Sequence, residues 1–179
     1  DFGAQFDIGK GQLLIGLDAT NAEMGVRITN PNNVDFYIDN LPDIDMDRYG
    51  TYGDWTISAG ELNVSFGVRF DRHEAEAGLA TTGPAVPMMA KQLAMQFNQS
   101  NRSWETTTSD LVARAWTETD NATWRASIAK KTRAPGYLER FAWLPTAASS
   151  GLADGNTYVG DLELDEETAV IFELGVDIN

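Results

Sequence analysis

The chain has 179 residues and is strongly acidic, with 13 Lys and Arg against 27 Asp and Glu and a formal net charge of −14. Nucleic acids and anionic lipids both bind basic surfaces, so this balance excludes a nucleic-acid partner and a polybasic attachment to a membrane. Cysteine is absent, which excludes disulfides, thiolate metal sites and cysteine nucleophiles.

Alternation of apolar and polar residues predicts about seven β-strands. They cover residues 1–8, 12–27, 47–58, 61–73, 105–118, 122–132 and 167–178. In the fourth stretch Val64, Phe66 and Val68 alternate with small or polar residues. A period of two places the two sets of side chains on opposite faces of a sheet.

The connections between these strands are alternately short and long. Tight turns are predicted near residues 9–11, 59–60 and 120–121, and long polar loops over 28–46, 74–104 and 133–166. Membrane strands need only about 9–11 residues, and outer-membrane barrels have short periplasmic turns and long outer loops. We therefore expect an all-β, antiparallel, up-and-down transmembrane barrel segment. One loop is predicted to contain a helix over residues 87–98, because Met89, Leu93 and Phe97 recur at a spacing of four.

The two faces of the predicted strands differ in charge. Arg69, Asp71, Arg114 and Arg125 fall on the face that would line a wet lumen. The lipid-facing sets contain no charge: Val64, Phe66 and Val68; Trp124, Ala126 and Ile128; and Phe172, Leu174 and Val176. Tyr and Trp favour membrane–water interfaces, so we expect an interfacial role for the aromatic residues of the strands. These are Tyr49, Tyr52, Trp55, Trp104, Trp116 and Trp124.

Residues 131–141 contain Arg-Ala-Pro-Gly-Tyr-Leu-Glu-Arg-Phe, and residues 160–167 read Gly-Asp-Leu-Glu-Leu-Asp-Glu-Glu. The first run resembles the Arg-Ala-Pro-Ser-Tyr-x-Glu-Arg-Tyr-like end of a strand in the barrels of TonB-dependent outer-membrane receptors. The second is similar to their Gly-Asn-Pro-x-Leu-x-Pro-Glu run before the next strand. Gly136, Asp161-Leu162 and Glu166 depart from these patterns. Residues 29–33, 47–50 and 67–71 are also similar in kind.

The resemblance implies a barrel of about 22 strands closed by a plug domain, of which this chain would be a later part. Residues 1–179 are thus expected to form one partial barrel domain without the plug and the remaining strands. Its implied function is TonB-coupled import across the bacterial outer membrane, with a ferric siderophore or another metal chelate as the small-molecule ligand, membrane lipid around the barrel, and TonB contacting the absent plug. The outer loops would bind the ligand, through candidates Phe36, Tyr37, Arg140, Trp143 and Tyr158.

The residues indicate no enzyme and no cofactor. His73 is the single histidine and lies beside no recognisable nucleophile, so a position at the end of the fourth strand explains it. Met88, Met89 and Met95 have thioethers that favour Cu(I), but a separation of about 10.5 Å along a helix keeps Met88 and Met95 from sharing one ion. Packing of the loop helix onto its neighbours is the alternative. For the whole chain, a passive porin or adhesin barrel and a soluble, acidic, glycan-binding β-sandwich stay open.

Overall fold

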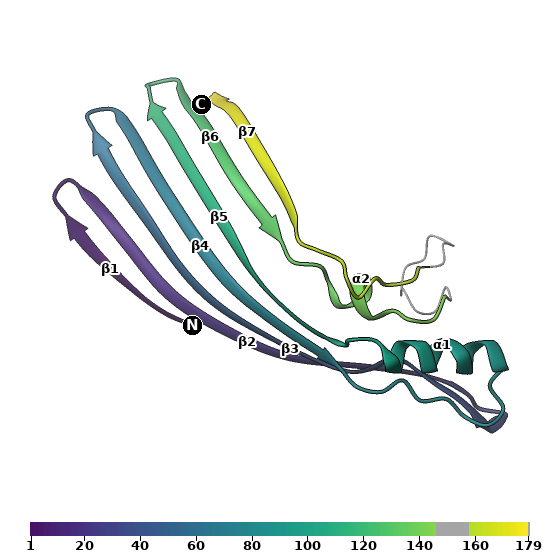
Figure 1. The fold of residues 1–179 in the computed structure, drawn as a ribbon. Coiled ribbons are helices and arrows are strands. Elements are labelled where there is room, and N and C mark those ends of the chain that lie inside the picture. The colour runs from purple at the N-terminus through teal and green to yellow at the C-terminus, as the bar shows by residue number, and fades with distance from the viewer. Residues whose placement is uncertain (146–157, 179) are drawn as a thin grey trace.

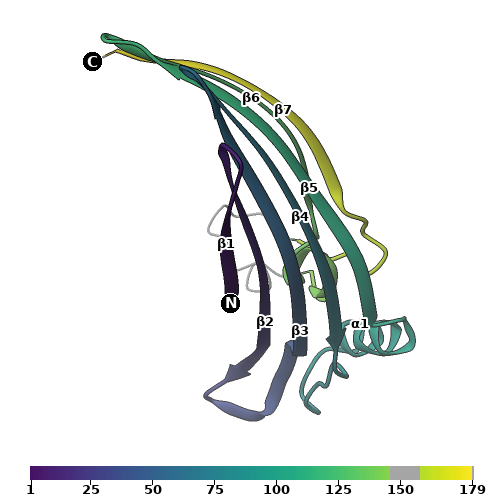
Figure 2. The ribbon, with the colours of Figure 1, turned by 90° about the vertical axis from the view of Figure 1, so that its left-hand side faces the viewer.

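A computed structural model describes residues 1–145 and 158–178. The chain forms one curved antiparallel sheet of seven strands in sequence order (Figures 1 and 2). The strands are β1 Phe2–Ile8, β2 Gly11–Asn30, β3 Asn33–Ala59, β4 Leu62–Ala77, β5 Ser103–Glu118, β6 Ala122–Arg133 and β7 Glu167–Ile178. The helices are α1 Met88–Gln99 and α2 Tyr137–Phe141. The predicted strands and the loop helix are confirmed, and the described residues form no second sheet such as a sandwich would require.

The tight turns lie together at one end of the sheet (Figure 1). Gly9 and Gly60 have φ values of 63° and 70°, a left-handed conformation that glycine adopts without a Cβ clash. Between β5 and β6, Thr119 N donates to Ala122 O at 2.9 Å. The opposite end carries the long connections, as the sequence predicts.

The predicted loop over residues 28–46 is wrong. These residues extend β2 and β3 into a long hairpin, in which Ile28 pairs with Ile38 and only residues 31–32 separate the strands. The Asn, Pro and Asp residues that suggested a loop are tolerated because the hairpin is irregular, with register shifts between Met24 and Asn30. Pro42 lies beyond the last pair of β3 with β4, Ile44 with Ala77, so its missing N–H breaks no ladder bond there.

The strand register separates an apolar face from a polar face. Phe66 pairs with Trp55 and Ala113, and Ala113 pairs with Ile128, which places these side chains on the apolar face. Many apolar side chains on that face are exposed, including Phe66 at 50%, Phe172 at 73% and Leu174 at 89%. Soluble proteins rarely expose so many neighbouring apolar side chains on one face. The polar face holds Arg69, Asp71, Arg114 and Arg125, as predicted.

The apolar face ends before the strands do. On β4 it covers residues 62–70, and the next side chains on the same face are those of Arg72, Glu74 and Glu76. A tilted strand crosses a bilayer in about 9–11 residues, so residues 62–70 match one crossing and the rest of β4 projects beyond it.

Half of the predicted interfacial aromatic residues lie on the other face. Tyr49, Trp55 and Trp124 are on the apolar face and are 52%, 36% and 56% exposed. Tyr52, Trp104 and Trp116 are on the polar face, because Tyr52 pairs with Arg69, Trp104 with Ala75 and Trp116 with Arg125. The interfacial prediction is therefore wrong for these three.

The buried core lies at the loop end, outside the apolar band. The β2–β3 hairpin, the segment before α1, α1 itself and the residues after α2 pack together there. The core consists of Ile38, Leu41, Ile44, Ala77, Ala80, Val86, Ala94, Phe97, Phe141, Ala142, Trp143 and Leu144. α1 is rich in Met, Ala and Gln and contains no β-branched residue, a composition that favours helix.

Neither helix in the described part of the chain is long and apolar enough to cross a membrane.

Candidate functional site

The polar face carries a network of two cations and two carboxylates from three adjacent strands. Arg69 Nη1 lies 2.8 Å from Asp18 Oδ2, and Arg69 Nε donates to Asp71 Oδ2 at 2.6 Å. Arg48 Nη2 donates to Asp18 Oδ1 at 3.0 Å. A Cβ at Gly50 would collide with Arg69 Nη2, so glycine leaves the space that the network occupies. The four charges balance one another.

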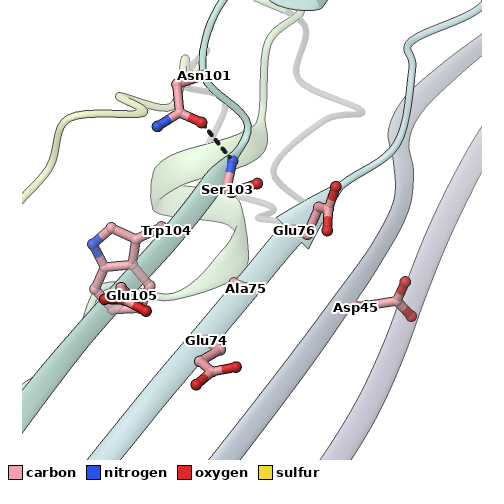
Figure 3. A pocket seen from close by; sticks show the side chains of 8 residues that line it. All are labelled: Asp45, Glu74, Ala75, Glu76, Asn101, Ser103, Trp104 and Glu105. Carbon is pink, nitrogen blue, oxygen red and sulfur yellow. Dashed lines mark hydrogen bonds between the residues drawn. The ribbon is translucent and has the colours of Figure 1, made fainter.

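A cavity of about 450 Å³ lies elsewhere at the loop end, around the acidic side chains of three neighbouring strands (Figure 3). Asp45, Glu74 and Glu105 belong to β3, β4 and β5, and register places all three on the apolar-face side, beyond the band. Arg72 pairs with Glu74 at 2.6 Å and with Glu105 at 3.0 Å.

A cavity of about 210 Å³ lies on the polar face, just beyond the charge network, and we call it the polar-face cavity. Two rows of paired residues form its wall. The first row is Thr20, Arg48 and His73, and the second is Ala22, Met46, Ala75 and Trp104. Residues of the α2 segment form the other side: Pro135, Tyr137, Arg140 and Phe141. In Figure 2, α2 lies on the concave side of the sheet.

Two donors with affinity for soft metals line the polar-face cavity. Met46 pairs with Ala75, two residues along β4 from His73, so Met46 and His73 are diagonal neighbours at about 7–8 Å between Cα atoms. His73 Nε2 lies 3.2 Å from Thr108 Oγ1. Burial lowers the pKa of His73, against the attraction of Asp71, so the imidazole is neutral at pH 7. A neutral imidazole is the form that binds metals.

Arg140 is a buried cation in the same cavity and is 4% exposed. Its Nη atoms donate to the main-chain oxygens of Leu164 and Leu162, and its guanidinium carbon lies 4.6 Å from the centroid of the Trp104 ring. Its Nε–H is buried and has no acceptor among the described residues. Burial lowers the pKa of Arg140 while Asp161 and Asp165 raise it, and a guanidinium stays charged.

A clamp of charged residues holds the α2 segment in place. Arg133 lies 2.7 Å from Glu139 Oε2 and 3.0 Å from Glu167 Oε2, and Gly136 N donates to Glu139 Oε2 at 2.6 Å. Gly160 N donates to Ala142 O at 2.7 Å, and a Cβ at Gly160 would lie 2.6 Å from Arg140 O. The clamp joins the end of β6 to the start of β7 and fixes Arg140 over the cavity.

The described residues contain no group of three or more His, Asp or Glu side chains that could hold a metal ion. A metal ion bound by Met46 and His73 would therefore need further ligands, supplied by a chelating molecule or by another part of the protein.

A family model described as "TonB dependent receptor-like, beta-barrel" matches residues 1–179. The chain belongs to this family. The sequence resemblance is therefore confirmed, and the protein is placed in the bacterial outer membrane. The apolar face is the lipid-facing side of a TonB-dependent receptor barrel, and the polar face lines its lumen.

Among solved structures, the chain is similar to the "Copper transporter OprC", with a TM-score of 0.65 and 19% sequence identity. The match covers 99% of this chain and 26% of that transporter, so the chain spans about a quarter of its length. At this identity the likeness shows the barrel fold. A search of curated proteins gives no significant match. Family and neighbour are receptors and transporters, in line with the expectation of a non-enzyme.

The five ligand-contact candidates lie in different environments in this receptor segment. Phe36 packs against the core, and Trp143 is 6% exposed with its Nε1 donating to Asp39 O at 2.9 Å. Tyr37 lies under the Arg27 guanidinium, 5.1 Å from its carbon, and Tyr158 is 39% exposed. Arg140 alone among the five lines the polar-face cavity. Ligand contact by any of them remains a prediction.

The three α1 methionines are exposed, Met88 at 66%, Met89 at 74% and Met95 at 53%. The packing alternative is therefore wrong, because Ala94 and Phe97 form the buried face of the helix. Their role as copper ligands stays untested.

The sequence does not predict a binding role for Met46 and His73, two residues of the cavity wall. Both lie where it predicted a loop or the end of a strand. The alternation along β4 could have placed His73: it follows Arg69 and Asp71 at steps of two residues, so its side chain lies on the same, lumen-facing side of the strand.

Acidification should release the clamp on the α2 segment. Arg133 and the Gly136 N–H hold the pKa of Glu139 below its ordinary value of 4.5. A lowered carboxylate pKa stabilises the clamp above pH 4.5, and this stabilisation is lost as the pH falls through the lowered pKa. Hydrogen exchange of residues 134–145, corrected for the intrinsic rate, should rise on acidification. Glu139→Gln should show fast exchange at every pH, and an unchanged pH dependence in this variant would contradict the assignment.

Proposed function

We propose that the chain is part of a receptor that imports a chelated metal across the outer membrane, energised by TonB acting on a plug domain outside this sequence. The observation that carries the proposal is the polar-face cavity, which faces the lumen beneath a loop-end segment. A ligand captured by the loops would meet this wall on its way into the barrel. Family membership supports an import receptor over a passive porin or adhesin.

Copper is the metal that the donors favour. A thioether selects Cu(I) and an imidazole suits copper, whereas carboxylate and carbonyl oxygens suit harder metals. Met46 and His73 supply such a pair on the cavity wall. The fold is shared with a copper transporter, which supports the same choice. A ferric siderophore is the alternative cargo.

Uptake in cells carrying the full-length receptor tests the proposal. Receptor-dependent accumulation of chelated copper should fall at least tenfold in the variant with Met46→Leu and His73→Gln. The matched variant Met88→Leu, Met89→Leu and Met95→Leu should retain it, because these methionines point to solvent on α1.

Other results would change the proposal. Loss of uptake in the α1 variant alone would move the copper contact to the loop helix. Uptake of ferric chelates but not copper would favour the siderophore alternative, and uptake without TonB would contradict energy coupling.

A further inference from the structure

The polar-face cavity has a charge pattern that decides which form of cargo it accepts. Its lumen-facing charged side chains are Arg48 and Arg140, with His73 neutral. Asp47 and Glu74 also border it, but register places their side chains on the opposite face. A bare metal cation entering the cavity would therefore be repelled by two guanidinium groups. Within the described part of the chain, no lumen-facing carboxylate lines the cavity to attract it.

The two guanidinium groups differ in what they already bind. Arg48 donates to Asp18 at 3.0 Å and lies 3.9 Å from Asp71, so carboxylates offset its charge. Arg140 bonds only main-chain oxygens through its Nη atoms, and Asp161 and Asp165 act on it without a salt bridge among the described residues. Its buried Nε–H has no acceptor there. Arg140 therefore brings to the cavity a charge that no salt bridge among the described residues neutralises.

The rest of the cavity is apolar and aromatic. Trp104, Tyr137 and Phe141 contribute rings, and Met46 and Ala22 contribute aliphatic surface. Its volume of about 210 Å³ is below the roughly 300 Å³ at which pockets for drug-sized ligands begin. It accommodates one arm of a chelate and not a whole one.

We propose that the polar-face cavity is a subsite for an apolar or aromatic carboxylate, with Arg140 as its cation and the rings of Trp104 and Tyr137 as its walls. This inference rests on the proposed import function and names the cargo: the metal arrives as a complex with an organic anion. Arg140 binds the carboxylate arm, and Met46 and His73 face the metal.

Binding of small probes to the purified full-length receptor tests the subsite. The probes are benzoate, its neutral isostere benzamide, and inorganic phosphate, followed by calorimetry and saturation-transfer NMR. Benzoate should bind at least tenfold more tightly than either of the others, because only it combines an anion with an apolar body. Arg140→Met should lose this preference.

Two further variants keep the result interpretable if Arg140→Met misfolds. Ala22→Phe fills the cavity from the strand wall without changing Arg140, and it should also exclude benzoate. Arg72→Met removes an arginine from the opposite face of β4 and should bind benzoate normally. Equal binding of benzoate and benzamide, tight phosphate binding, or full benzoate binding in Ala22→Phe would each overturn the proposal.

The outcomes separate this inference from the proposed function. A receptor that prefers benzoate but imports no metal complex would overturn the import function and leave the subsite standing. A receptor that imports copper but does not discriminate benzoate from benzamide would overturn the subsite alone.

Discussion

Replacing Arg69 by methionine should destabilise the folded barrel by about 2–4 kcal/mol, because the carboxylates of Asp18 and Asp71 lose their shared cation. Their side chains are 8% and 11% exposed, so little water reaches them to replace it. Arg48 would remain 3.0 Å from Asp18 and 3.9 Å from Asp71 and could offset only part of the repulsion. Urea unfolding of the full-length receptor in lipid vesicles measures the loss.

Arg72→Met is the matched control for this change. Arg72 also pairs with two carboxylates, but it is 56% exposed on the opposite face, where salt bridges contribute about 0–1 kcal/mol. Adding Asp71→Asn to Arg69→Met should recover part of the stability, because one of the two repelling charges is removed. Equal effects of Arg69→Met and Arg72→Met would contradict the role of the network.

The sequence predicted the strands well wherever one face meets lipid. In β6 and β7 the alternation of Trp124, Ala126 and Ile128 with charged or polar residues has a physical cause, since a slip by one residue would place Arg125 in the bilayer. Contact with lipid thus determines the register of these strands and makes their ends predictable. The predicted boundaries of β6 and β7 differ from the observed ones by a residue or less.

The same rule fails beyond the membrane, where both faces of a strand can be polar. The β2–β3 hairpin extends past the lipid band because Ile38, Leu41 and Ile44 pack under α1 and Trp143, a contact between segments far apart in the chain. Local composition around Asn32 and Pro42 indicates a loop, and only this tertiary packing makes it a strand. Met46 falls in the same predicted loop, so its place on the cavity wall could not be predicted either.

Residues 131–141 show what a resemblance to a known family predicts beyond the alternation of apolar and polar residues. Alternation alone places Arg133 at the end of β6 and says nothing of Glu139, six residues later. The structure joins them at 2.7 Å, and Arg133 also lies 3.0 Å from Glu167 at the start of β7. The family resemblance therefore identified the segment that forms one side of the polar-face cavity. The other side depends on which paired residues of β2, β3, β4 and β5 lie opposite this segment.

The two faces of the sheet can be distinguished by one charge placed on either side. Ala113→Arg on the lipid face, between Phe66 and Ile128, should destabilise the barrel by about 2–4 kcal/mol, because the guanidinium enters the hydrocarbon layer. Ala129→Arg lies at a similar height but on the lumen face, between Val112 and Ile171, where charge is accommodated. Its cost should be about 1 kcal/mol or less.

Urea unfolding of the two full-length variants in vesicles gives the comparison directly. The substitutions are chemically identical and their positions lie in the same pair of strands, so propensity and net charge cancel between them. The remaining difference in the free energy of unfolding shows which face of the sheet contacts lipid and which contacts water. An equally small destabilisation by both substitutions would mean that both faces meet water, which would contradict the assignment of a lipid face. A larger loss for Ala129→Arg would exchange the lipid and lumen faces and with them the side from which a cargo reaches Arg140.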